Sequence, residues 1–145
     1  MECPMPTINT NDAKELKSIF EECKTIAIVG LSPDNTKASH QVALYLQQHG
    51  FKIFPIYPKG DYILGEKVYR NILEIEEKID MVDMFRKPEI ADTLVKECIG
   101  RGDVKVFWLQ LGIVNNNACE IAKKHGIKPV QNRCTKIEYE RAVRP

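Results

Sequence analysis

Hydroxyl groups, backbone amides and a glycine gather in residues 24–39, where together they could bind a phosphate group. Gly30 ends the apolar run of residues 25–29, and the loop formers after it lead to Ser39, which can cap a helix. A helix start presents unpaired N–H groups and the positive end of its dipole, so an anion binds there readily. The stretch therefore predicts a phosphate site. A single glycine also fits an ordinary tight turn between a strand and a helix.

This stretch differs from the glycine-rich fingerprint of dinucleotide-binding proteins. Only Gly30 of the three glycines in G-x-G-x-x-G is present, and the next apolar run leads to Lys59 instead of an acidic residue for a ribose 2′-hydroxyl. A lysine there favours a ligand with an additional phosphate, or is a solvated surface residue. These differences disfavour an NAD(P)-dependent oxidoreductase. The sequence nevertheless leaves two alternative functions open: an NAD(P)-dependent oxidoreductase, and a protein interaction module derived from a nucleotide-binding fold.

Length and charge limit the possible classes of protein. With 145 residues, 43% of them hydrophobic, the chain can bury one core and is expected to form a single domain. Lys and Arg number 21 against 20 Asp and Glu, so no overall field would attract nucleic acid or an anionic membrane. No apolar run approaches the roughly 20 residues of a membrane-spanning helix. We therefore expect neither nucleic acid nor membrane as a partner, and the sequence does not identify a protein partner.

The cysteines indicate a reducing compartment and no metal site. They are far apart, without a C-x-x-C pair or a histidine at metal-ligand spacing. Their number is odd, and the N-terminus lacks the basic and apolar regions of a signal peptide. We therefore expect a cytoplasmic protein with free thiols at Cys3, Cys23, Cys98, Cys119 and Cys134.

Apolar runs alternate with helical patterns along the chain. Residues 1–8 are expected to form an N-terminal arm, and residues 9–145 a single domain. The pattern predicts strands at residues 25–29, 51–57, 66–69, 80–85, 104–109 and 127–130, with a loop at 58–65 and a helical turn capped by Asn71. It predicts helices from Asn9 or Thr10 to Cys23, then at residues 39–49, 88–100, 118–124 and from 135 onward. This alternation is typical of an α/β, Rossmann-like, doubly wound fold whose mostly parallel sheet carries helices on both faces.

Ligands of such folds bind at the carboxyl ends of the strands, so the residues just after each strand matter most. We single out five clusters of such residues, and three of them contain a basic residue. No pair of nucleophile and base stands out among them, so we predict no catalytic residue. The clusters are residues 30–32, 57–59, 85–87, 110–112 and 132–134.

In combination, these blocks resemble the small stand-alone CoA-binding proteins and the N-terminal CoA-binding domain of the succinyl-CoA synthetase α subunit. The resemblance covers residues 25–142. It rests on the order of residues 28–32, 55–59, 64–65, 80–86, 108–112 and 132–134, since no single block is specific. It implies a protein that binds coenzyme A or an acyl-CoA. The synthetase's phosphohistidine domain has no counterpart here, so the resemblance implies binding without catalysis.

The resemblance also implies three groups of CoA-binding residues. The pyrophosphate would be held by Gly30, Leu31, Ser32 and the helix that begins near Ser39, with Lys37 as one candidate for the positive charge. The adenosine 3′-phosphate end would border Tyr57, Pro58 and Lys59. The pantetheine arm would follow Phe85, Arg86, Gln110, Leu111 and Gly112.

Three further side chains each have two interpretations. Arg86 could pair with a phosphate, or with Asp83 or Glu89. Arg133 could belong to the ligand site or to a structural ion pair. Cys134, beside Arg133 and a helix start, could be a reactive thiol or a buried inert one.

Overall fold

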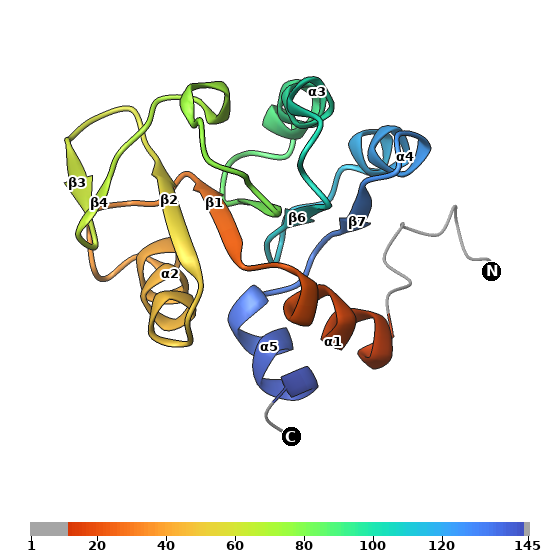
Figure 1. Cartoon of the computed structure of the whole chain (residues 1–145), viewed down its shortest axis with the longest axis horizontal. Coiled ribbons are helices and arrows are strands. Elements are labelled where there is room, and N and C mark those ends of the chain that lie inside the picture. Colours follow the sequence, from red (N-terminus) through yellow and green to blue (C-terminus); the bar gives the residue numbers. More distant parts are fainter. Residues whose placement is uncertain (1–11, 144–145) are drawn as a thin grey trace.

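Five parallel strands form the central sheet in the order β2-β1-β5-β6-β7 (Figure 1). This computed structural model describes residues 12–143. The strands are β1 (Thr25–Val29), β2 (Lys52–Ile56), β5 (Met81–Met84), β6 (Val106–Leu109) and β7 (Lys128–Val130). After β1 the chain first adds β2 on one side of β1 and later adds β5 on its other side. The point where the winding direction reverses therefore lies between β1 and β5, and the predicted doubly wound α/β fold is confirmed.

Helices cover both faces of the sheet. In Figure 1, α1 (Ala13–Glu22), α2 (Ala38–Gln48) and α5 (Thr135–Val143) lie below the sheet. Above it lie α3 (Ile90–Arg101), α4 (Asn116–Lys124) and the short 3₁₀ helix η1 (Ile72–Glu74). Successive strand residues point to opposite faces, so the sheet separates two apolar cores. Ile26 and Ile28 pack on the α1, α2 and α5 side, whereas Ala27 and Val29 pack on the α3 and α4 side.

Helix α1 buries an apolar stripe whose residues recur every three or four positions. Leu16, Ile19, Phe20 and Cys23 are all buried. The helix begins at Ala13, because the Asp12 carboxylate caps it by accepting a hydrogen bond of 2.8 Å from the N–H of Glu15. The predicted caps Asn9 and Thr10, and the predicted arm of residues 1–8, lie outside the described residues.

A small hairpin replaces part of the predicted loop at residues 58–65. Strand β3 (Tyr62–Ile63) pairs antiparallel with β4 (Glu66–Lys67). The turn residues Leu64 and Gly65 have positive φ values of 54° and 78°, as a two-residue hairpin turn requires. The strand predicted at residues 66–69 covers β4, but β3 was not predicted because a two-residue strand is too short to show a periodic pattern.

The segment after the hairpin returns to the carboxyl end of β2. The N–H of Tyr69 donates to the Pro55 carbonyl at 2.9 Å, and the N–H of Tyr57 donates to the Tyr69 carbonyl at 3.0 Å. Asn71 then caps η1 as predicted, by accepting a hydrogen bond of 2.7 Å from the N–H of Leu73. Arg70 and Asn71 are thereby placed beside the end of β2.

Other helix boundaries differ from the prediction by one or two residues. Pro88 lies in a turn before α3, which begins at Ile90, and α4 begins at Asn116 because Asn115 caps it. On α2, Val42 and Leu46 are buried, whereas Leu44 is 37% exposed.

Candidate functional site

The carboxyl ends of four neighbouring strands meet at one edge of the sheet. The hydrogen-bonded ladder continues one residue beyond each strand. The N–H of Gly30 donates to the Ile56 carbonyl at 2.9 Å, and the N–H of Phe85 donates to the Val29 carbonyl at 2.8 Å. The N–H of Gln110 likewise donates to Met84 at 3.2 Å. The clusters predicted after β1, β2, β5 and β6 are therefore brought together, with the winding reversal between Gly30 and Phe85.

Glycine is required at position 30 for two local reasons. Its φ of +90° lies in a region that side chains disfavour, and a Cβ atom there would lie 2.9 Å from Cδ of Arg86. The Arg86 side chain thus crosses the turn after β1. This contact joins the loops after β1 and β5.

The loop after β1 is organised by Ser39, but not in the predicted way. Ser39 was expected to cap α2. The cap position is instead occupied by Lys37, and no side chain caps the helix. Ser39 lies one residue inside the helix, almost fully buried, and its Oγ accepts a hydrogen bond of 3.0 Å from the N–H of Ser32. Its role is therefore to hold the loop, and the uncapped start of α2 keeps backbone N–H groups open to an anion.

Two further contacts fix the shape of this loop. The N–H of Asp34 donates to Ser32 Oγ at 3.0 Å, and His40 Nδ1 donates to the Ser32 carbonyl at 2.9 Å, since a carbonyl can only accept.

The loop presents backbone and charged groups to a ligand. The side chain of Leu31 is fully buried, so only its backbone could meet a ligand. Hydrogen bonds from the N–H and the hydroxyl of Thr36 lower the pKa of Asp34. Asp34 therefore brings a negative charge to the loop, beside the exposed Lys37.

Gln110 lies inside the protein instead of lining an open path. Its side chain is 4% exposed, and its Oε1 accepts hydrogen bonds from the Thr135 N–H at 3.1 Å and from Thr135 Oγ1 at 2.9 Å. The side chain therefore anchors the start of α5. The next two residues are open: Leu111 is 64% exposed, and Gly112 has a positive φ and donates its N–H to Asn132 Oδ1.

Asp83, in the middle of β5, extends this buried network. It is fully buried, and its Oδ2 lies 3.0 Å from Thr135 Oγ1. Burial raises the pKa of Asp83 well above its usual value, although the hydrogen bond with Thr135 opposes the shift. Thr135 has a single hydroxyl proton. It donates this proton to Asp83 Oδ2 when the carboxylate is ionised, whereas with Asp83 protonated it accepts from Asp83 and donates to Gln110 Oε1, which can only accept. Burial therefore favours the neutral form of this carboxyl group beneath the edge of the sheet.

Arg133 and Cys134 follow β7. Arg133 forms an ion pair with Glu138 at 3.5 Å, and its carbonyl accepts a hydrogen bond of 2.8 Å from Nε1 of Trp108. The structural interpretation of Arg133 is thus observed, while a ligand contact stays a prediction. Cys134 is half-buried against the α1, α2 and α5 side of the core. Its reactivity also stays a prediction.

Three predicted basic residues face solvent. Arg86, Lys37 and Lys59 are exposed, and none of them pairs with an acidic side chain within residues 12–143. Asp83, one proposed partner of Arg86, is instead bonded to Thr135. Their charges are therefore available to an anionic ligand.

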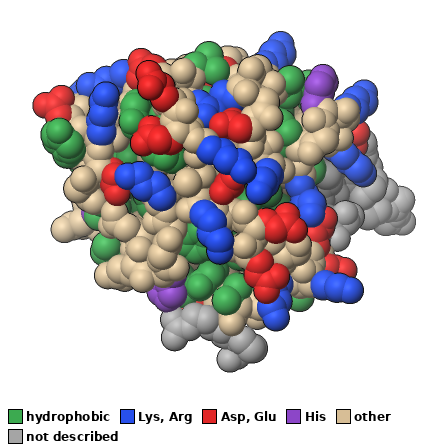
Figure 2. All heavy atoms as spheres, viewed as in Figure 1, with side chains coloured by type: hydrophobic (Ala, Val, Ile, Leu, Met, Phe, Trp, Pro, Cys, Tyr) green, Lys and Arg blue, Asp and Glu red, His purple; other side chains and the backbone are tan. Residues whose placement is uncertain are grey.

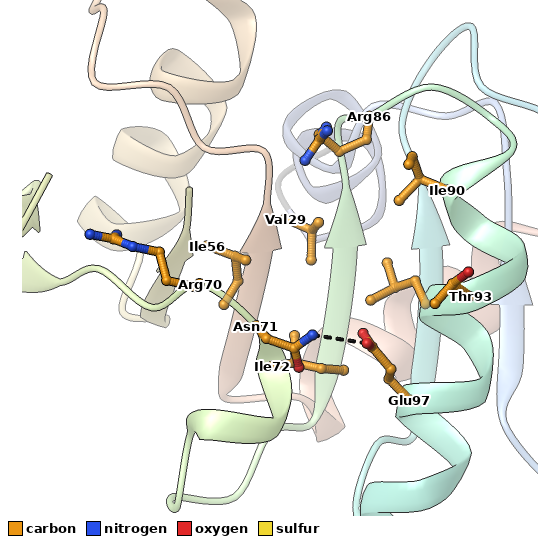
Figure 3. A pocket seen from close by; sticks show the side chains of 10 residues that line it. Val29, Ile56, Arg70, Asn71, Ile72, Arg86, Ile90, Thr93 and Glu97 are labelled. Carbon is orange, nitrogen blue, oxygen red and sulfur yellow. Dashed lines mark hydrogen bonds between the residues drawn. The ribbon is translucent and has the colours of Figure 1, made fainter. Parts of the chain in front are cut away.

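A cavity of about 260 Å³ opens beside the carboxyl ends of β1 and β2, between η1 and α3 (Figure 3). Its walls are apolar and comprise Val29, Ile56, Ile72, Ile90 and Leu94. Its polar lining consists of Arg70, Asn71, Arg86, Thr93 and Glu97, with a hydrogen bond of 2.8 Å from Asn71 Nδ2 to Glu97 Oε2. Apolar walls with a few polar groups are typical of a site for a small ring or chain.

The sequence prediction missed Arg70, Asn71 and Glu97. The first two reach the site only because Tyr69 pairs with Ile56, and Glu97 comes from the second turn of α3. The tyrosine and asparagine on either side of Arg70 are the only local signal, and they identify a short strand and a helix cap instead of a ligand site.

The described residues contain neither a metal cluster nor a membrane-spanning helix. No group of three potential metal ligands occurs within residues 12–143, and no helix there is long and apolar enough to span a membrane. On the face seen in Figure 2, Lys and Arg side chains gather near the middle with Asp and Glu side chains among them. That face therefore carries no large field of a single sign.

The fold and this open edge define a Rossmann-like domain of the class that binds nucleotides at the carboxyl ends of its strands. A family model described as a CoA binding domain matches residues 24–140. The chain therefore belongs to the CoA-binding domain family.

The chain is similar to a protein of about its own length and to a segment of a much longer one. The uncharacterized protein YneT of Bacillus subtilis is 35% identical over 125 residues, which cover 86% of this chain and 92% of that protein. An ADP-forming acetate–CoA ligase of Archaeoglobus fulgidus is 30% identical over 125 residues, covering 79% of this chain but only 18% of the ligase.

Solved structures agree with the fold. A hypothetical protein from Pyrococcus horikoshii OT3 superposes with a TM-score of 0.89 and 35% identity over 99% of both chains. A protein from Thermus thermophilus superposes with a TM-score of 0.85 and 29% identity, over 91% of this chain and 99% of that one.

Proposed function

We propose that this protein binds coenzyme A or an acyl-CoA along the carboxyl edge of its sheet. The observation that carries the proposal is the uncapped start of α2 beside the Gly30 turn, at the point where the winding reverses. Membership of the CoA-binding domain family supports the same ligand.

The pyrophosphate is assigned to the start of α2. The first N–H groups of a helix lack intrahelical partners, and the helix dipole adds positive potential there. Lys37 occupies the cap position and supplies a full positive charge, which offsets the neighbouring carboxylate of Asp34. The N–H of Ser32 is already bonded to Ser39, so Ser32 shapes the loop and leaves the phosphate contacts to the helix start.

The adenosine end is assigned to the region after β2. The cavity of about 260 Å³ has the apolar walls and the polar lining that a heterocyclic base requires. Tyr57, Pro58 and Lys59 leave β2 beside it, with Tyr57 half-buried and the other two exposed. A base in the cavity would place its ribose near this turn.

The pantetheine arm is assigned to the loops after β5 and β6. It would leave the pyrophosphate over Phe85 and Arg86 and pass toward Leu111 and Gly112, which are exposed. The buried Gln110 would not contact the arm. Its side chain accepts a hydrogen bond from the Thr135 N–H and so holds the start of the loop after β6 in place.

A binding role without catalysis suits this arrangement best. The aligned segment makes up only 18% of an acetate–CoA ligase, as expected of a CoA-binding module that larger enzymes combine with other parts. Within residues 12–143 the predicted site contains no paired nucleophile and base.

Calorimetry with CoA, NAD and NADP tests this proposal. We expect CoA to bind with a Kd on the order of micromolar, because one helix start and a few basic side chains must offset the ordering of a flexible ligand. NAD and NADP should bind far more weakly. Binding of NAD or NADP in preference to CoA would favour the oxidoreductase alternative, and binding of none of the three would favour an interaction module.

A further inference from the structure

Arg70 stands between two hollows of the surface. Arg70 is among the residues that line the cavity at the ends of β1 and β2, and also among those that line a second hollow of about 350 Å³. In Figure 3 it extends from beside Ile56 away from the first cavity. The second hollow is also lined by Gly60, Asp61, Tyr62, Lys67 and Val68, from the hairpin and the segments flanking it.

The guanidinium of Arg70 is largely unused. One of its N–H groups donates to the Tyr57 carbonyl at 3.1 Å, and within the described residues no acidic side chain pairs with it. A guanidinium carries five N–H donors in a planar fork that matches two oxygens of a phosphate. Most of these donors therefore remain available to a ligand.

The charge around Arg70 favours an anion. Lys67 lines the same hollow and lies over the ring of Tyr69 at 5.1 Å, while Lys59 is exposed on the turn that Arg70 braces through Tyr57. Asp61 is the only acidic residue among those lining the second hollow. Lys67 and Arg70 thus outnumber Asp61 in this lining, while the Glu74 carboxylate lies on the backbone of Arg70, accepting a hydrogen bond of 2.9 Å from its N–H.

We propose that Arg70 binds the 3′-phosphate of the CoA ribose and thereby determines the preference for CoA over dephospho-CoA. This inference rests on the proposed function. With the base in the first cavity, the ribose lies near Tyr57, and Arg70 is the cation that borders both this cavity and the neighbouring hollow. Lys59 and Lys67 then add charge around the phosphate but lack the fork that binds two of its oxygens.

The test compares CoA with dephospho-CoA in calorimetry, using the full chain with Arg70→Met, Arg70→Lys and Lys17→Met. Lys17 is exposed on α1, so Lys17→Met removes one positive charge away from the proposed site. The wild type should bind CoA about tenfold more tightly than dephospho-CoA, as one charge-assisted contact provides. Arg70→Met should remove most of this preference, Arg70→Lys should retain part of it, and Lys17→Met should leave it intact. Thermal unfolding checks that each variant is folded.

The ratio of the affinities for CoA and dephospho-CoA distinguishes a direct contact between Arg70 and the 3′-phosphate from a structural role of Arg70 in holding the Tyr57 turn. If Arg70 only braced the Tyr57 turn, Arg70→Met would weaken both ligands equally and leave their ratio unchanged, which would overturn the inference. Equal binding of both ligands by the wild type would also overturn it while leaving the proposed function standing. Failure of the wild type to bind CoA at all would remove the proposed function itself.

Discussion

The Arg86 side chain lies against Gly30, so that a Cβ atom at position 30 would be 2.9 Å from Arg86 Cδ and 3.0 Å from the Phe85 carbonyl oxygen. One of these neighbours is a flexible side chain, but the other is backbone and cannot move aside easily. The turn after β1 and the turn after β5 therefore fit each other only when residue 30 is glycine.

Gly30→Ala should lower both stability and CoA affinity. The positive φ costs about 1 kcal/mol, and the displaced Phe85 turn adds to this cost. The matched control is Gly50→Ala, because Gly50 has a similar φ of +96° but no atom within 4 Å of an added Cβ. Urea unfolding should show the larger loss for Gly30→Ala. Equal losses would mean that the contact with Arg86 and Phe85 carries no energetic weight.

Ser39→Ala should weaken CoA binding several-fold while the fold stays intact. The substitution removes the acceptor for the N–H of Ser32, and the loss of one such hydrogen bond costs about 1 kcal/mol. The loop before α2 then becomes less ordered, and the ligand must order it again. Ser18→Ala on α1, which removes a hydrogen bond to Glu22, is the control. Unchanged calorimetric affinity in Ser39→Ala would argue against the loop assignment.

Asp83→Asn should flatten part of the pH dependence of stability. Burial raises the folded-state pKa of Asp83, so the folded protein retains a proton that the unfolded chain loses above a pH of about 3.9. This contribution is complete at lower pH and is lost as pH rises through the folded-state pKa. Within that window the wild type should lose about 1.4 kcal/mol per pH unit relative to the variant, whose amide does not titrate. A difference between the two proteins that stays constant from pH 4 to 9 would show that Asp83 is ionised in the fold.

Asp80→Asn should have the opposite pH dependence. Burial alone would raise the pKa of Asp80, but hydrogen bonds from the N–H groups of Lys24 and Thr25, with Lys105 and Lys78 nearby, lower it overall. The ionised form therefore stabilises the fold above the unfolded-state pKa, and this stabilisation is lost as pH falls through the folded-state value. We expect the variant to be less stable by about 1–2 kcal/mol at pH 7 and to approach the wild type in acid. A penalty that persists unchanged at pH 2 would contradict this.

The main strands were predictable because each is a buried apolar run between turn formers. The first of them, Thr25–Val29, has the bounds that its β-branched pattern indicates. The strand predicted at residues 66–69 covers the second strand of the small hairpin, but β3 and the turn were not predictable, since a two-residue strand shows no periodicity and Leu64 adopts a positive φ that leucine rarely takes. The position of Arg70 follows from the pairing of Tyr69 with Ile56, which the sequence did not indicate.

The sequence predicted which strand ends meet at one edge of the sheet, but not the contacts among their side chains. Ser39 has the right chemistry for a cap, yet a shift of one residue turns it into an acceptor inside the first turn. Gln110 follows β6 as predicted, but its side chain turns inward because Thr135 offers it two donors from a distant part of the chain. Asp83 did leave a signal, a single acidic residue within an apolar strand, which indicates either a buried partner or a neutral carboxyl group.

The position of the bound ligand is the most direct test of this account, and an amide NMR titration with CoA measures it. We predict that the largest shift changes fall at residues 30–41, 57–59, 70–71, 85–86 and 111–112, at the carboxyl edge of the sheet. The opposite end of the sheet has a hollow of its own, lined by residues that include Phe20, Gly50 and Tyr139. Shift changes centred on that hollow, with residues 30–41 unmoved, would contradict the central claim.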